Sequence, residues 1–122
     1  PSMLHWLLSE AFWQEHPEQI AFLSQAVFES PQAPPPFVTL AHLDIDIAHD
    51  TLDQLHMIQA PTLIIAGEED RTTPLYHARE VAERLPDSQL KVIEGKGSSH
   101  LLMNERAEEF RNIALQFLQN VN

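Results

Sequence analysis

The sequence predicts an α/β protein in which a helical segment precedes a βαβα unit with two parallel strands. Two short aliphatic runs, at residues 62–66 and 89–93, have the length and composition of strands, and an amphipathic helical pattern lies between them. A strand, a helix and a second strand within about thirty residues indicate parallel strands joined by a crossover. We therefore expect residues 61–122 to form the α/β part and residues 1–60 a helical segment.

Two helices are predicted at the beginning of the sequence. Apolar residues between positions 3 and 13 recur on one helical face, which indicates a first helix there. Pro17 suits the first position of a second helix because its fixed φ fits a helix and its missing N–H is not needed. Helical spacing then continues until Ser30. The apolar positions behind these two predictions are Leu4, Leu7, Leu8, Ala11, Phe12, Ile20, Leu23, Val27 and Phe28.

A proline-rich stretch follows these helices. Residues 31–36 contain four prolines and cannot continue a helix, so we expect a stiff, extended spacer. A third helix is predicted over residues 37–48. Asp50 is then suited to cap a short helix that ends near Met57, because its carboxylate can accept from the first free N–H groups of that helix.

The α/β part is predicted as strand, helix, strand and helix. The continuous apolar run at 62–66 ends before Gly67 and indicates a strand covered on both faces. Thr73-Pro74 provides an N-cap and a first-turn proline for the helix that follows, and residues 89–93 form the second strand. From about Arg106 onwards, apolar residues at helical spacing predict a final amphipathic helix.

Composition excludes several classes of partner and site. The net charge of −11, from 18 acidic and 7 basic residues, repels phosphate backbones and anionic lipids, so we expect no nucleic-acid or membrane partner. No cysteine is present, which excludes a cysteine nucleophile or thiolate metal site within these residues and fits a cytoplasmic location. No apolar run reaches the roughly twenty residues of a membrane span. Pro1 in place of an initial methionine fits processing, cleavage from a longer chain, or tag residues.

Asp70 and His100 are the candidate catalytic residues. Each follows a predicted strand, and in parallel sheets functional groups gather beyond the carboxyl ends of the strands. Neighbouring strands lie about 4.8 Å apart, so the two loops can bring the carboxylate to the imidazole. A carboxylate in that position would fix the histidine tautomer and stabilise the imidazolium formed during a reaction.

The residues around this pair resemble the C-terminal half of the α/β-hydrolase fold. The resemblance lies in residues 61–70, which end on Gly67-Glu68-Glu69-Asp70, in Pro74, and in His100 five residues before Glu105. It implies that Asp70 and His100 are the acid and the base of a triad, that residues 61–122 are the last two strands and helices, and that residues 1–60 are a helical cap. Residues 40–43 and 49–55 resemble 3-oxoadipate enol-lactonase-like members, which implies a small ester or lactone substrate and no cofactor.

The nucleophile of that family is missing from this sequence. Its Gly-x-Ser-x-Gly elbow needs glycines four positions apart, and the only glycines are Gly67, Gly95 and Gly97. The loop before His100 also differs, because Ser98 and Ser99 stand where many members have glycine. These serines are expected to hydrogen-bond within the loop; a nucleophilic role is the alternative. We expect the chain to be inactive alone, with the nucleophile in a missing N-terminal half.

Two further sets of residues have both a functional and a structural interpretation. His42, His49 and His56 recur every seven residues with aspartates nearby, so they are either a metal site or solvated side chains of a polar face; we assign no metal ligand. Four aromatic residues also have two interpretations: either they line an apolar substrate pocket, or they pack in the core. These residues are Trp6, Phe12, Trp13 and Phe22.

Three functional hypotheses remain open on the sequence. The first is the C-terminal portion of an α/β-hydrolase that pairs with its N-terminal half. The second is a truncated, non-catalytic module with an unpaired strand edge at 62–66, which predicts a homodimer that buries this edge or exchanges cap helices. The third is a helical regulatory protein, which requires that the two strands do not form.

Overall fold

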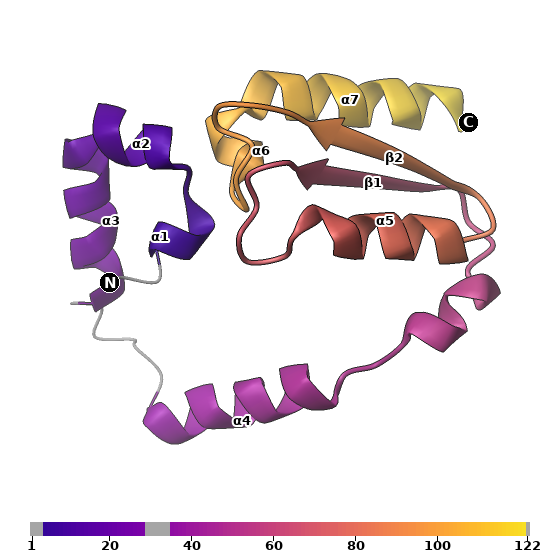
Figure 1. Cartoon of the computed structure of the whole chain (residues 1–122), viewed down its shortest axis with the longest axis horizontal. Coiled ribbons are helices and arrows are strands. Elements are labelled where there is room, and N and C mark those ends of the chain that lie inside the picture. Colours follow the sequence, from indigo (N-terminus) through magenta and orange to yellow (C-terminus); the bar gives the residue numbers. More distant parts are fainter. Residues whose placement is uncertain (1–3, 29–34, 122) are drawn as a thin grey trace.

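The computed structural model describes residues 4–28 and 35–121. The described residues form a two-stranded sheet, and Figure 1 shows helices on both sides of it. The sheet and its helices come from the second half of the chain, as the sequence predicted. Met3, the end of the second predicted helix near Ser30, and most of the predicted spacer lie outside the described residues.

The sheet consists of β1 (Thr62–Gly67) and β2 (Ser88–Ile93), which pair in parallel. Helix α5 (Leu75–Arg84) contacts both strands, and α7 (Ala107–Asn120) lies on the other face against β1 (Figure 1). This arrangement confirms the predicted βαβα unit, and it contradicts the hypothesis of a purely helical protein. The side chains of β1 are only half-buried, not fully covered as predicted, because β2 is its only strand partner among the described residues.

The first predicted helix is wrong in extent. The chain forms α1 (Leu4–Leu7), breaks at Leu8 and Ser9, and resumes as α2 (Glu10–Glu15). The reason for the break is Ser9, whose hydroxyl accepts a hydrogen bond from the backbone N–H of Phe12 at 3.1 Å and so caps α2. The predicted apolar face still exists, because residues of α1 and of α2 pack in the same apolar cluster.

The other helices before the sheet match their predicted ranges closely. Helix α3 (Pro17–Phe28) begins at the predicted proline, and α4 (Pro36–Ala48) begins one position before the predicted start. The short helix that follows, η1 (Leu52–Met57), is a 3₁₀-helix with Thr51 at its N-cap position. Asp50 nevertheless accepts from the backbone N–H of Leu52 at 3.3 Å, so it provides part of the capping expected of it.

An apolar cluster joins the N-terminal helices: Leu4, Leu8 and Ile20 are buried, and Phe12 and Trp13 pack against them. In the α/β part, the buried apolar residues are Leu85, Ile93 and Leu102. Helix α4 contributes no buried residue and is exposed at all but one of its positions.

Two local features were not predicted. A short helix, α6 (Leu102–Glu105), lies between β2 and α7. The residue at the N-cap position of α5 is Pro74 and not Thr73, and no side chain caps that helix.

Along the described part of the chain, no helix has the length and apolar character that crossing a membrane requires.

Candidate active site

Two loops that follow the strands form the candidate site. The acid loop, residues 68–74, leaves β1, and the histidine loop, residues 94–101, leaves β2. The backbone N–H of Glu69 bonds to the carbonyl of Ser98 at 3.0 Å and also contacts the Ser98 hydroxyl at 3.1 Å. The main chains of the two loops are therefore joined directly beside the candidate residues.

Gly67 permits this close approach. A Cβ atom added at Gly67 would lie 2.0 Å from the carbonyl oxygen of Ser98, a distance that neither loop can accommodate without moving its backbone. The glycine at the end of the first predicted strand thus has a packing role. It lets the acid loop and the histidine loop meet.

Replacing Gly67 with alanine is expected to destabilise the fold by about 1–3 kcal/mol through overpacking. Gly95→Ala is the comparison, because a Cβ there meets nothing within 4 Å and adds only the strain of a φ of +72°. Urea unfolding followed by circular dichroism measures both variants. A Gly67→Ala variant that is as stable as the wild type would contradict the close-approach explanation.

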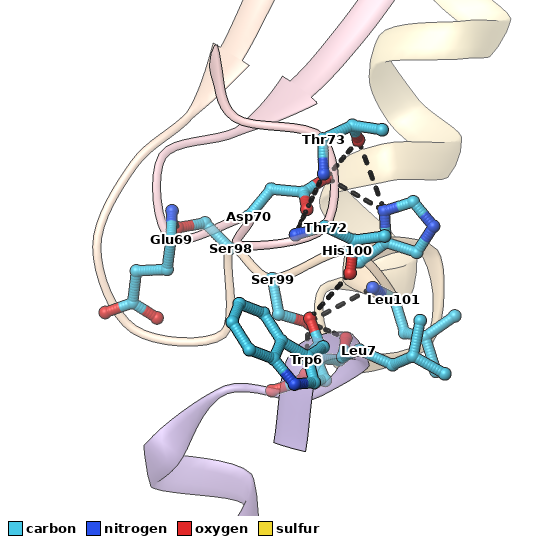
Figure 2. Close-up of polar contacts among 11 residues, drawn as sticks. Trp6, Leu7, Glu69, Asp70, Thr72, Thr73, Ser98, Ser99, His100 and Leu101 are labelled. Carbon is cyan, nitrogen blue, oxygen red and sulfur yellow. Dashed lines mark hydrogen bonds and ion pairs between the residues drawn. The ribbon is translucent and has the colours of Figure 1, made fainter. Parts of the chain in front are cut away.

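Asp70 and His100 come together as the sequence predicted. His100 Nδ1 lies 3.0 Å from Asp70 Oδ2 (Figure 2). The Asp70 side chain is 9% exposed and that of His100 is 33% exposed. The carboxylate is therefore largely shielded from water, while the imidazole still reaches solvent and could contact a substrate.

Groups of the acid loop donate hydrogen bonds to both oxygens of the Asp70 carboxylate. Oδ1 accepts from the backbone N–H groups of Thr72 and Thr73 at 2.8 and 2.9 Å, and Oδ2 accepts from the Thr73 hydroxyl at 2.8 Å. Burial raises the pKa of Asp70, but the hydrogen bonds from Thr73, His100 and Thr72 together outweigh it and lower the pKa below its usual value of 3.8. Asp70 is therefore an ionised hydrogen-bond acceptor at neutral pH.

Thr73 is a member of the site that sequence reasoning missed. Its hydroxyl lies between the pair, 2.8 Å from Asp70 Oδ2 and 3.3 Å from His100 Nδ1. The predicted capping role was wrong because this hydroxyl bonds back to Asp70 instead of forward to the helix. A Thr three residues after a candidate acid is a weak signal in sequence, since the same pattern marks many turns.

Ser98 and Ser99 hydrogen-bond within the loop, as predicted. They are 0% and 1% exposed. Ser98 Oγ donates to the carbonyl of Gly95 at 2.6 Å, and Ser99 Oγ lies 2.6 Å from a carboxylate oxygen of Glu105. Hydroxyls buried and bonded in this way are not presented to a substrate, which disfavours the nucleophile alternative.

A cavity of about 380 Å³ adjoins the pair. Its polar side chains are Asp70, Thr73, His77 and His100. The apolar part of its lining comes from β1, α5, α6 and α7, and includes Ile64, Ala66, Val81, Leu102 and Phe110. An apolar space with a few polar groups is the usual form of a small-molecule site.

The four aromatic candidates do not line this cavity. Phe12 and Trp13 pack in the N-terminal cluster, in agreement with their core interpretation. Trp6 and Phe22 are 59% and 71% exposed, so neither interpretation of them is met in this structure.

The histidine series does not form a metal centre. His42, His49 and His56 are exposed, and they are spread over α4, the segment after it, and η1. Over residues 4–28 and 35–121, no three His, Asp or Glu side chains come close enough together to hold an ion. Helix α4 ends at Ala48, so His49 and His56 lie outside it and the three histidines do not share one helical face.

Solved structures similar to this chain place it in a class. An esterase from Thermogutta terrifontis aligns with a TM-score of 0.78 at 29% identity, over 98% of this chain and 42% of the esterase. An α/β-hydrolase from a deep-sea metagenome library aligns with a TM-score of 0.72 at 27% identity, over 96% and 42% of the two chains. An N-acyl homoserine lactone degrading enzyme aligns with a TM-score of 0.67 at 31% identity, over 93% and 44%. The fold is therefore that of an α/β-hydrolase, in part.

The sequence match gives the family. Residues 12–107 match the family described as Hydrolase_4, serine aminopeptidase S33, and the chain belongs to this family of hydrolases.

Two curated relatives have similar sequences over shorter stretches. A poly(3-hydroxyalkanoate) depolymerase from Ectopseudomonas oleovorans is 43% identical over 65 residues, which are 53% of this chain and 22% of that protein. A 2-hydroxy-6-oxo-6-phenylhexa-2,4-dienoate hydrolase from Burkholderia cepacia is 37% identical over 73 residues, 60% of this chain and 25% of that protein. The matched stretches thus span about a quarter of these relatives. They support a hydrolase, whereas the finer enol-lactonase-like assignment stays a prediction.

Proposed function

We propose that this chain provides the acid and the general base of an α/β-hydrolase that cleaves an ester, lactone or similar bond. The observation that carries the proposal is the 3.0 Å contact between Asp70 and His100 at the carboxyl ends of two parallel strands. The names of similar proteins support the substrate class, since they include an esterase and a lactone-degrading enzyme. Residues 1–60 are proposed as the cap and residues 61–122 as part of the catalytic core.

The proposed roles follow from the geometry of the pair. With Nδ1–H donated to Asp70, His100 has Nε2 free to accept the proton of a nucleophilic hydroxyl. The hydroxyl oxygen then bonds to the carbonyl carbon, and the proton on Nε2 passes to the leaving-group oxygen as the ester bond breaks. Asp70 stabilises the imidazolium between these two transfers, because it remains an anion at neutral pH.

The nucleophile is proposed to come from chain outside these 122 residues, since no Gly-x-Ser-x-Gly elbow occurs within them. The test compares this chain with an extended protein, in which the coding sequence upstream of Pro1 is translated together with it. We expect the extended protein to hydrolyse p-nitrophenyl esters and the 122-residue chain to show no turnover. Turnover by the chain alone that requires Ser98 or Ser99 would overturn the proposal, as would an upstream reading frame with no nucleophile elbow.

A second candidate function is self-association, for which the free edge of β1 is the specific observation. β2 covers one edge of β1, and no strand within the described ranges covers the other. Helix α4 also exposes several large apolar side chains: Phe37, Leu40, Leu43, Ile45 and Ile47. Unpaired edges and apolar surface of this kind favour contact with another chain.

We therefore expect the isolated chain to form a homodimer. Light scattering coupled to size-exclusion chromatography measures its mass across micromolar concentrations. The variant Ile64→Lys, in the middle of β1, is expected to lower the dimer fraction, and Gln116→Lys on the exposed side of α7 provides a control with the same charge change. A monomer at every concentration would contradict this candidate.

A further inference from the structure

We propose that Glu105 is a positioning residue for His100, acting through Ser99, and that it couples the N-terminal helices to the histidine loop. The inference rests on the proposed function of His100. It starts from a carboxylate that the proposed proton transfers do not use. Asp70 already occupies His100 Nδ1, and the Glu105 carboxylate faces the two serines Ser9 and Ser99.

The Glu105 carboxylate accepts hydrogen bonds from residues that are far apart in sequence. Oε1 accepts from the backbone N–H of Ser9 at 3.0 Å and lies 2.6 Å from Ser99 Oγ. Oε2 accepts from the Ser9 hydroxyl. Ser9 and Ser99 are 3% and 1% exposed, so water does not replace these bonds. Hydrogen bonds to a carboxylate in a shielded place are stronger than bonds between neutral groups.

Ser99 transmits this anchoring to His100. The Ser99 hydroxyl has a single proton to donate, and Glu105 Oε1 is nearer to it than the Leu7 carbonyl, at 2.6 against 2.9 Å. The same hydroxyl accepts from the backbone N–H of Leu101 at 3.1 Å, and it shares this N–H with the Leu7 carbonyl at 3.0 Å. The residues on both sides of His100 are therefore fixed by one hydroxyl that Glu105 holds in place.

Helix α1 lies against both loops of the site. The carbonyls at the end of a helix have no partner within it, and here they accept bonds from the two loops. The Trp6 carbonyl accepts from the Thr72 hydroxyl at 2.9 Å, and the Leu7 carbonyl accepts from the Leu101 N–H at 3.0 Å (Figure 2). Leu101 also packs against the N-terminal apolar cluster. Because Glu105 holds Ser9, two positions after the end of α1, it fixes the helix that contacts the acid loop and the histidine loop.

The position of the His100 ring is the direct readout of this proposal. NMR of the ring nitrogens in the 122-residue chain reports whether Nδ1 carries the proton, and the low-field Nδ1 proton signal reports its bond to Asp70. Loss of the His100 signals in His100→Gln assigns them among the histidines of the chain. For Glu105→Ala we expect the low-field proton signal to be lost and the ring-nitrogen shifts to move towards those of a freely exchanging imidazole.

Three variants make the test specific. Glu105→Gln retains an oxygen that can accept from the Ser9 N–H and the Ser99 hydroxyl, so we expect His100 signals close to those of the wild type. Ser99→Ala leaves the bonds between Ser9 and Glu105 intact but removes the link to the loop, so we expect the change seen in Glu105→Ala. Glu108→Ala removes an exposed carboxylate in the first turn of α7 and is expected to leave His100 unchanged.

Wild-type His100 signals in folded Ser99→Ala or Glu105→Ala would overturn the inference, and Ser99→Ala decides the question if Glu105→Ala does not fold.

Turnover of the extended protein is the second readout. There Glu105→Ala is expected to lower kcat about 10- to 100-fold with little change in KM, as a small displacement of a catalytic group does. If His100→Ala keeps full turnover while the NMR changes occur as expected, the proposed function fails and the positioning role stands.

Discussion

Replacing His100 with alanine is expected to lower kcat for ester hydrolysis by the extended protein about 10³-fold or more. General acid–base transfer by a positioned side chain contributes about 10²- to 10⁴-fold, and in this proposal both proton transfers pass through His100 Nε2. The measurement is p-nitrophenyl ester turnover under saturating substrate. We expect KM to change little, because the imidazole acts mainly on the transition state.

The control for this variant is His56→Ala. His56 lies on the exposed η1 helix, away from the cavity beside the pair, so its loss removes a histidine without touching the site. It is expected to retain the turnover of the wild type. Equal turnover of the His100→Ala variant and the wild type would remove His100 from the mechanism.

Asp70→Asn is expected to lower the free energy of unfolding of the 122-residue chain by about 1.5–3 kcal/mol at neutral pH. Hydrogen bonds to a charged group contribute amounts of this order, and Asp70 accepts such bonds from Thr72, Thr73 and His100. The pKa of Asp70 is lowered in the folded state, so its contribution is present above the unfolded-state pKa near 3.8 and is lost as the pH falls through the folded-state pKa.

The difference in stability between wild type and Asp70→Asn should therefore shrink as the pH falls below the unfolded-state pKa near 3.8 and through the lower folded-state pKa. Urea unfolding at several pH values measures this difference directly. Asp44→Asn on exposed α4 controls for the loss of one negative charge from a chain that carries −11. A difference between wild type and Asp70→Asn that stays constant down to the lowest pH would show that the carboxylate charge of Asp70 does not stabilise the fold.

Local patterns were enough to predict most of the elements. The aliphatic runs near 62–66 and 89–93 became β1 and β2, and Pro17 marks the first residue of α3. The pairing of Asp70 with His100 was also predictable, because parallel strands place their exit loops at one edge of the sheet. These predictions depend on periodicity and on topology, which are both encoded over short stretches.

The parts that the sequence did not reveal depend on contacts between distant residues. The break between α1 and α2 requires Ser9, which both caps α2 and bonds to Glu105, 96 positions away. The role of Thr73 requires His100 nearby. A serine in an apolar helical pattern or a threonine before a proline gives no sign of a partner so far along the chain. The predicted first helix is therefore too long. Thr73 was predicted to cap α5, whereas its hydroxyl bonds to Asp70.

The network around Glu105 gives the N-terminal helices a place in the proposed mechanism. These helices were predicted as a cap, and they contact the acid loop and the histidine loop through α1, through Ser9, and through an ion pair between Glu15 of α2 and Lys96 of the histidine loop. In the proposed enzyme, a change in the docking of these helices would move both loops together. The geometry of the Asp70 and His100 pair then depends on residues 4–15 as well as on the sheet.

Asp70 and His100 are proposed to act as one catalytic pair, and a double-mutant cycle on kcat of the extended protein distinguishes joint from independent action. Each single variant, Asp70→Asn and His100→Ala, is expected to lower kcat, and the double variant is expected to be no slower than His100→Ala alone, because Asp70 acts only through the imidazole. If the two losses multiply in the double variant, or if either single variant turns over at the wild-type rate, the two residues do not form the pair that this structure suggests.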